Sequence, residues 1–161
     1  MNFQELLHLF GPHVATAIVA FFSGFLPFIN IELYMVVAGA MLSDSFPAWT
    51  LGVAAGFGQM IAKSMLFWSG SSALHSRTVR RFTRDRIDRL TDRMRGMNPW
   101  VLNAANFASA LVGVPPFLLV SILAGVIRMK FWQFYLTGLV GRSLRLVIIV
   151  EFPHVLRKIV W

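Results

Sequence analysis

The sequence has no cysteine and few charged side chains. Of its 161 residues, 14% are charged and 57% are hydrophobic. The absence of cysteine excludes disulfide bonds and thiolate metal sites. A soluble domain carries about 25% charged residues, so this low charge, with a mean hydropathy of +0.65, indicates an integral membrane protein.

Residue patterns typical of a catalytic or metal site are also missing. No two of the four histidines have the i, i+4 spacing of a metal site on a helix. The sequence contains neither a phosphate-binding glycine loop nor a nucleophile elbow. We therefore expect no enzyme activity, no metal and no cofactor.

The positive charge is concentrated in one segment. Lys and Arg number 15 against 7 Asp and Glu, and eight of the 15 lie within residues 77–95. Apolar residues recur there at roughly helical spacing, so we expect a basic amphipathic helix on the membrane surface. Excess Lys and Arg place such a segment on the cytoplasmic side. We expect it to contact anionic lipid headgroups and not nucleic acid.

Two apolar segments are interrupted in the middle by residues that break helices. Each half is shorter than the roughly 20 residues that a helix needs to cross about 30 Å of hydrocarbon. Each segment therefore either spans once with a break or turns back as a re-entrant hairpin, which must be packed in protein or line a cavity. The interrupting residues are Pro27 in residues 14–42, and Gly113, Pro115 and Pro116 in residues 100–127.

Two further apolar segments are uninterrupted. Residues 47–69 and 131–150 are long enough to cross the membrane, at about 1.5 Å per helical residue. Residues 151–161 are too short to cross and are expected to lie at the interface, as is a short helix ending at Gly11-Pro12. The sequence thus predicts a single all-α membrane domain, residues 1–161, with two broken hairpins, two full transmembrane helices and interfacial amphipathic helices.

The order of these segments occurs twice. An offset of 86 residues places Gly39 on Gly125 and the first break on the second, and we assign both glycines to the breaks. The first repeat is residues 1–73, the second is residues 99–150, and residues 74–98 link them. If both broken segments are re-entrant, each repeat crosses the membrane once and the two are inverted, as in many secondary transporters.

Glu32 lies inside the first broken segment. A carboxylate at bilayer depth costs about 2.5 to 3.5 kcal/mol, so it needs a partner or a polar cavity. Lys63, Arg142 and Arg145 are basic candidates within the membrane, and the sequence does not decide among them. One interpretation is a static buried ion pair. The other is a transport path, in which a low dielectric favours the protonated carboxyl and lets Glu32 take up and release a proton.

Polar residues of the other segments are predicted to share this path. Arginine stays charged at any accessible pH and binds phosphate oxygens well. For Arg145 the alternative is a side chain that extends to the membrane surface. The predicted transport-path residues are Glu32, Lys63, Arg142, Arg145, Gln59 and Asn30.

Several short elements within residues 20–150 resemble the DedA/VTT superfamily, also described as SNARE-associated Golgi proteins. Glu32 is followed seven residues later by the glycine of an Ala-Gly-Ala stretch, as in the family's first hairpin. The chain lacks the arginines common in the second hairpin, which makes it a divergent member. The other matching elements are Pro115-Pro116, Ala124-Gly125 and Gly141-Arg142 with Arg145.

This resemblance implies two opposed re-entrant hairpins and a location in a bacterial inner (plasma) membrane. It also implies a membrane transport protein that moves phospholipid or lipid phosphate between leaflets, as a lipid scramblase does, or a small anion across the membrane. Coupling to protons would run through Glu32. The alternative is a membrane-organising or adaptor protein that transports nothing and acts through its basic cytoplasmic helix. Assembly into a homo-oligomer stays open.

Overall fold

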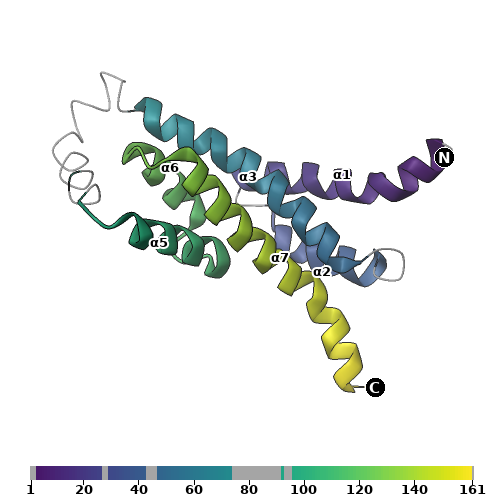
Figure 1. Ribbon diagram of the computed structural model, residues 1–161. Helices are drawn as coiled ribbons and strands as arrows, with labels where there is room; N and C mark the ends of the chain where they lie inside the picture. Colours follow the sequence, from purple (N-terminus) through teal and green to yellow (C-terminus); the bar gives the residue numbers. More distant parts are fainter. Residues whose placement is uncertain (1–2, 27–28, 43–46, 74–91, 93–95, 161) are drawn as a thin grey trace. The chain divides into compact units, whose positions relative to one another are not determined.

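A computed structural model describes residues 3–26, 29–42, 47–73, 92 and 96–160 (Figure 1). The predicted all-α class is confirmed for this part of the chain, where the ordered elements are helices. Pro27 and the basic segment of residues 77–95, apart from residue 92, lie outside the described residues. The helices are α1 (Phe3–Phe25), α2 (Ile31–Leu42), α3 (Ala48–Ala73), α5 (Pro99–Val112), α6 (Phe117–Val126) and α7 (Phe131–Val160).

The two predicted interruptions separate α1 from α2 and α5 from α6. The helices of each pair contact one another, and the hydroxyl groups of Thr16 and Tyr34 join α1 to α2 by a hydrogen bond of 3.1 Å. The 86-residue offset predicted from the sequence also relates the helix starts, since α2 begins at Ile31 and α6 at Phe117.

Residues at the second interruption end one helix and begin the next. Gly113 follows α5 with φ of 86°, a left-handed conformation that glycine adopts without a steric penalty. Its amide donates to the carbonyl of Ser109. Pro116 precedes the first residue of α6. Gly113, Pro115 and Pro116, which we assigned to a break, thus lie between α5 and α6.

The assignment of Gly39 and Gly125 to the breaks is wrong, because both lie within helices, α2 and α6 respectively. A Cβ atom at Gly39 would lie 2.7 Å from the carbonyl oxygen of Val150, and one at Gly125 would lie 1.9 Å from that of Phe67. In lipid, where helices associate largely by van der Waals packing, small residues let two backbones approach. These glycines thus serve helix packing.

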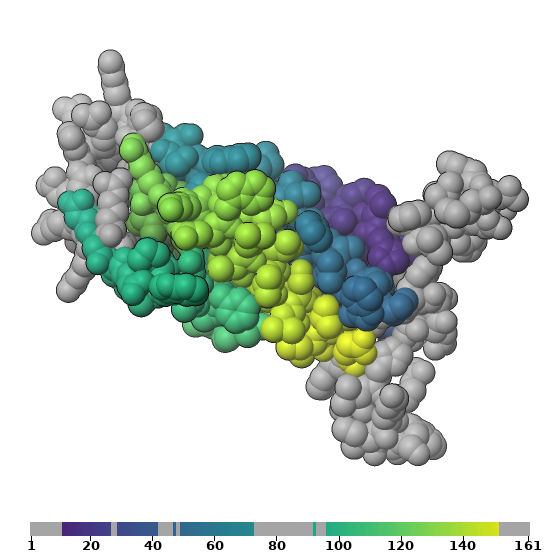
Figure 2. Space-filling model, in the orientation of Figure 1, coloured from purple at the N-terminus to yellow at the C-terminus, as the bar shows by residue number. Residues whose placement is uncertain are grey.

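One helix in the described residues is long and apolar enough to cross a membrane, namely α7 over Phe131–Glu151. Only 28% of that window is buried inside the protein, unlike the core helix of a soluble protein, and α7 forms part of the visible surface in Figure 2 (green to yellow). The other predicted span, α3, has 26 residues. Gln59 and Lys63 lower its mean hydropathy, so α3 is long enough to cross a membrane but does not meet the hydropathy requirement.

Two predicted helix ends differ from the structure. α1 does not stop at Gly11-Pro12 but runs through both residues to Phe25. Proline removes one backbone donor, and here the flanking turns continue the helix despite that loss. Likewise α7 does not end at residue 150 but continues to Val160, because the tail contains no strong terminator after its single proline.

The described chain forms two compact units, and both long helices contribute to each. The first unit is Met1–Ala62 with Arg142–Trp161, and the second is Lys63–Gly141. In the first unit, α3 and α7 run antiparallel, since Gly52 lies against Val147 and Gly56 against Ser143. Each unit thus combines one broken pair with segments of α3 and α7.

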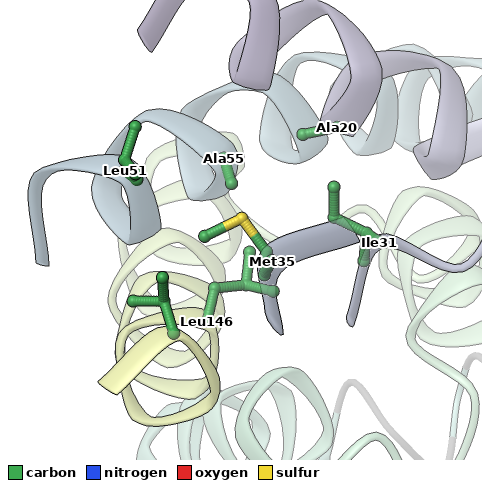
Figure 3. Close-up of a cluster of buried hydrophobic side chains, with 7 residues drawn as sticks. Ala20, Ile31, Met35, Leu51, Ala55 and Leu146 are labelled. Atoms are coloured by element: carbon green, nitrogen blue, oxygen red, sulfur yellow. The ribbon is translucent and has the colours of Figure 1, made fainter. Parts of the chain in front are cut away.

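Each unit has a core of its own. Figure 3 shows the first, in which Met35 of α2 lies among side chains from α3 and α7. In the second unit the ring of Phe134 stacks on those of Phe67 and Phe117, with centroids 4.9 and 6.0 Å apart. The first core consists of Ala20, Ile31, Met35, Leu51, Ala55, Leu146 and Val150.

Candidate functional site

The candidate site lies in the first unit, where α2 begins. The side-chain oxygen of Asn30 accepts hydrogen bonds from the amides of Glu32 and Leu33, at 3.0 and 3.2 Å. Such a cap satisfies amides that have no partner within the helix. Asn30, which we predicted as a transport-path residue, therefore has a structural role that the sequence analysis missed. Its signal was an Asn directly before an apolar helix.

Glu32 forms an ion pair with Arg145 of α7, in which the guanidinium Nη2 donates to the carboxylate Oε1. The two residues are 113 positions apart in the sequence. Among the three basic candidates, the structure therefore brings Arg145 onto Glu32. A hydrogen bond between two ionised groups is roughly twice as strong as one between neutral groups, so this contact joins α2 firmly to α7.

The buried neighbours of the two charged residues hold this pair in place. Ile31 and Leu146 both belong to the core of the first unit (Figure 3). Glu32 directly follows Ile31 and Arg145 directly precedes Leu146, so both charged side chains lie at the margin of that core. The Arg145 side chain is 21% exposed and that of Glu32 is 43% exposed. The carboxylate is therefore accessible from outside the protein.

Arg142 adds a second cation on the same helix. It lies three residues before Arg145, so the two side chains occupy neighbouring positions on one face of α7. Arg142 interacts electrostatically with both Arg145 and Glu32. Two guanidinium groups beside one carboxylate give this cluster an excess positive charge, which suits an anionic ligand.

An open groove of about 410 Å³ begins at this cluster. Asn30 and Glu32 form its polar end. Its apolar walls come from one face of α2 and one of α7, through Leu33, Val36, Ile148 and Ile149. The groove therefore has a charged end and a hydrocarbon wall within one continuous surface, an arrangement that fits an amphiphilic molecule.

The predicted path residues of α3 do not line this groove. Gln59 is buried in the first unit, where its amide nitrogen donates to the hydroxyl of Ser23 at 3.1 Å. Its amide oxygen has no hydrogen-bond partner among the described residues. Lys63 is 4% exposed and belongs to the second unit. A role for either residue in transport stays a prediction.

A neutral polar cluster in the second unit escaped the sequence analysis. The amide of buried Asn106 donates to the carbonyl of Phe134 at 3.0 Å and to the hydroxyl of Thr137 at 2.7 Å. Near the break, Ser109 donates to the carbonyl of Pro115 at 2.7 Å. These bonds join α5 to α7 and to the break itself. The signal in the sequence was an amide side chain in an otherwise apolar segment.

Comparison with known proteins identifies the family. The model of the VTT domain matches residues 26–153, which begin just after α1 and include the ion pair, the groove, α2 and the second broken pair. No curated protein and no solved structure gives a significant match. The chain thus belongs to the VTT domain family of membrane proteins.

Proposed function

We propose that this VTT domain protein transports lipid, moving a phosphate-bearing lipid between the two leaflets along the groove that begins at Glu32. The observation that carries the proposal is the ion pair of Glu32 with Arg145 at the polar end of an apolar groove. Ionisable side chains within membrane segments are costly, and they commonly mark the pathway of a transported substrate. A headgroup that replaces one partner of the pair would travel with its acyl chains against the apolar wall.

The composition of the groove favours a lipid over a small anion. At its end, Glu32 is paired with Arg145 and interacts with Arg142, and planar guanidinium groups match phosphate oxygens in geometry and charge. A small anion needs only this polar end. The walls from Leu33, Val36, Ile148 and Ile149 have a use when the ligand also carries hydrocarbon.

The arrangement of the broken pairs supports the same mechanism. In our proposal α1 with α2 and α5 with α6 are re-entrant hairpins, which form two inverted repeats. Transporters built this way place discontinuous helices and their binding site near the middle of the bilayer. The 86-residue offset between the starts of α2 and α6 and the contact within each pair both support this assignment.

Glu32 also offers a route for coupling lipid movement to protons. A carboxylate that pairs with Arg145 holds the arginine; a protonated carboxyl releases it to bind a phosphate. Uptake of one proton by Glu32 thus corresponds to one exchange of partners at Arg145. This step uses only Glu32, which lines the groove, and Arg145, which pairs with it.

The test reconstitutes the full chain in vesicles that contain headgroup-labelled phospholipid and follows its quenching by dithionite. We expect the natural chain to accelerate quenching, and Glu32→Gln to reduce the rate by about tenfold, equivalent to roughly 1.4 kcal/mol in the barrier. Glu151→Gln is the matched control, because it removes a carboxylate of α7 that does not line the groove. We expect it to retain the natural rate.

Two outcomes would reject the proposal. One is a natural chain that gives no acceleration, with or without a pH gradient. The other is a Glu32→Gln variant that folds and transports as Glu151→Gln does. The first would favour the alternative, a membrane organiser that acts through the basic segment of residues 77–95. The second would show that Glu32 takes no part in transport. The coupling step alone fails if a pH gradient leaves the rate of the natural chain unchanged.

A further inference from the structure

A small pocket in the second unit lies where α6 ends and α7 begins. Its volume is about 180 Å³, below the roughly 300 Å³ at which pockets accept drug-sized ligands. The pocket therefore fits a headgroup but not a whole lipid. Three of its lining residues are cationic or polar, namely Arg128, Lys130 and Gln133, and the apolar residues Leu102, Ile127 and Met129 also line it.

Arg128 occupies a backbone position that normally belongs to glycine. α6 ends with two hydrogen bonds, from the amide of Arg128 to the carbonyl of Gly125 at 3.1 Å and from that of Met129 to Ala124 at 3.0 Å. In this pattern the first residue after the end of the helix, here Arg128, has a left-handed conformation, and it is usually glycine. Arg128 has φ of 55° and is the one non-glycine residue with positive φ among those described.

This departure indicates a function for the Arg128 side chain. Glycine would end α6 in the same way without the steric strain that any Cβ atom brings to a left-handed residue. Strained backbone positions of this kind concentrate at binding sites. Because Arg128 lines the pocket, this left-handed backbone position carries a guanidinium group there.

Both charged residues that the described lining of the pocket contains are basic. Arg128 and Lys130 are exposed, and within the described part of the chain no carboxylate forms an ion pair with either. Among the described residues, the lining contains no acidic side chain. Two cations and the amide of Gln133 around so small a space match the oxygens and charge of one phosphate group.

We infer that this pocket binds the phosphate of an anionic lipid headgroup at the membrane surface. We favour a lipid over soluble phosphate as the source of this group for two reasons. Apolar residues also line the pocket, and two exposed tryptophans are sequence neighbours of lining residues. Trp100 follows Pro99 of the lining and is 79% exposed, and Trp132 precedes Gln133 and is 68% exposed. Indole rings at such positions prefer the interface between membrane and water. The site is independent of the groove, which lies in the first unit.

The experiment titrates the full chain in neutral detergent with dioctanoyl phosphatidylglycerol and measures binding by calorimetry. We expect Arg128→Gly and Lys130→Gln each to weaken binding about tenfold. Lys158→Gln removes a cation from the sequence of the first unit and should leave the affinity unchanged. Arg128→Gly should also keep or raise the melting temperature, because glycine suits the left-handed position. A purely structural role for Arg128 predicts no change in affinity.

Two further arms locate the site and identify the ligand. The same losses should occur in a chain that combines Glu32→Gln with Arg145→Gln, which removes both charges of the ion pair. Dioctanoyl phosphatidylcholine and glycerol 3-phosphate should bind at least about tenfold more weakly than phosphatidylglycerol. Equal binding of glycerol 3-phosphate would overturn the lipid as ligand. Unchanged affinity in both Arg128→Gly and Lys130→Gln would overturn the site.

Discussion

The two broken helix pairs share a backbone plan and differ in charge. Asn30 precedes α2 and Pro116 precedes α6, and these residues are related by the 86-residue offset. Glu32 stands two residues after Asn30, whereas Leu118 stands two residues after Pro116. A broken pair therefore does not need a carboxylate in order to form. The charge of the first pair is an addition to the common plan.

The polar contacts of the second pair show what the common plan requires. Ser109 and Asn106 satisfy backbone and side-chain groups through neutral hydrogen bonds. Neutral bonds suffice to hold a break together in an apolar environment, where an unsatisfied backbone group costs several kcal/mol. The ion pair of Glu32 with Arg145 goes beyond that structural need, which is a further reason to assign it a function.

We expect the largest effect when a carboxylate is introduced into the second pair at the position that corresponds to Glu32. Leu118→Glu should cost about 2.5 to 3.5 kcal/mol, the cost of a charged residue at the centre of a helix in the membrane. The residue that corresponds to Arg145 in the first repeat is Gln59, which is neutral. We expect a sharp fall in the yield of folded protein, measured by size-exclusion chromatography of the detergent-extracted chain. Leu118→Met is the control and should behave as the natural chain.

A smaller effect should distinguish the two related glycines. Gly125→Ala brings a Cβ atom to 1.9 Å from a backbone oxygen, and Gly39→Ala brings one to 2.7 Å. Overpacking of this kind costs about 1 to 3 kcal/mol, and we expect Gly125→Ala to be the more destabilising. Thermal unfolding in detergent measures both. Gly11→Ala has nothing within 4 Å and should cause no loss. Equal stability of all three variants would contradict the packing role.

The smallest effect concerns the caps. Asn30→Ala should destabilise α2 by about 1 kcal/mol, because two amides of its first turn lose their acceptor. Asn30→Asp should restore the cap. Pro116 makes no side-chain hydrogen bond to α6, so Pro116→Ala removes no capping hydrogen bond. Hydrogen exchange at the first turns of α2 and α6 measures the difference, and equal exchange after both alanine substitutions would show that the cap of Asn30 has no energetic weight.

Much of the fold follows from local sequence patterns. Glycine and proline inside an apolar run predict a break, and the starts of α2 and α6 keep the offset found in the sequence. The pattern does not separate a glycine that bends the backbone from one that lets two helices touch. Gly39 and Gly125 belong to the second kind, and only the packing of α2 and α6 reveals it.

The site was less predictable, for two different reasons. The pairing of Glu32 with Arg145 joins residues 113 positions apart, and no local pattern determines which of three cations arrives there. The cap formed by Asn30 involves only neighbouring residues and could have been predicted from the sequence. We instead assigned Asn30 to the transport path, because it is a polar residue within an apolar segment. Asn106 shows the same difficulty, since the acceptors of its amide come from α7.

The make-up of the first unit has a consequence for how the chain is synthesised. Residues 1–62 emerge early, yet the unit also needs residues 142–161, which include Arg145. A ribosome therefore releases Glu32 long before the guanidinium that will neutralise it exists. Until α7 is inserted, the nascent chain carries this acid without its partner Arg145, and the arrival of α7 completes the first unit.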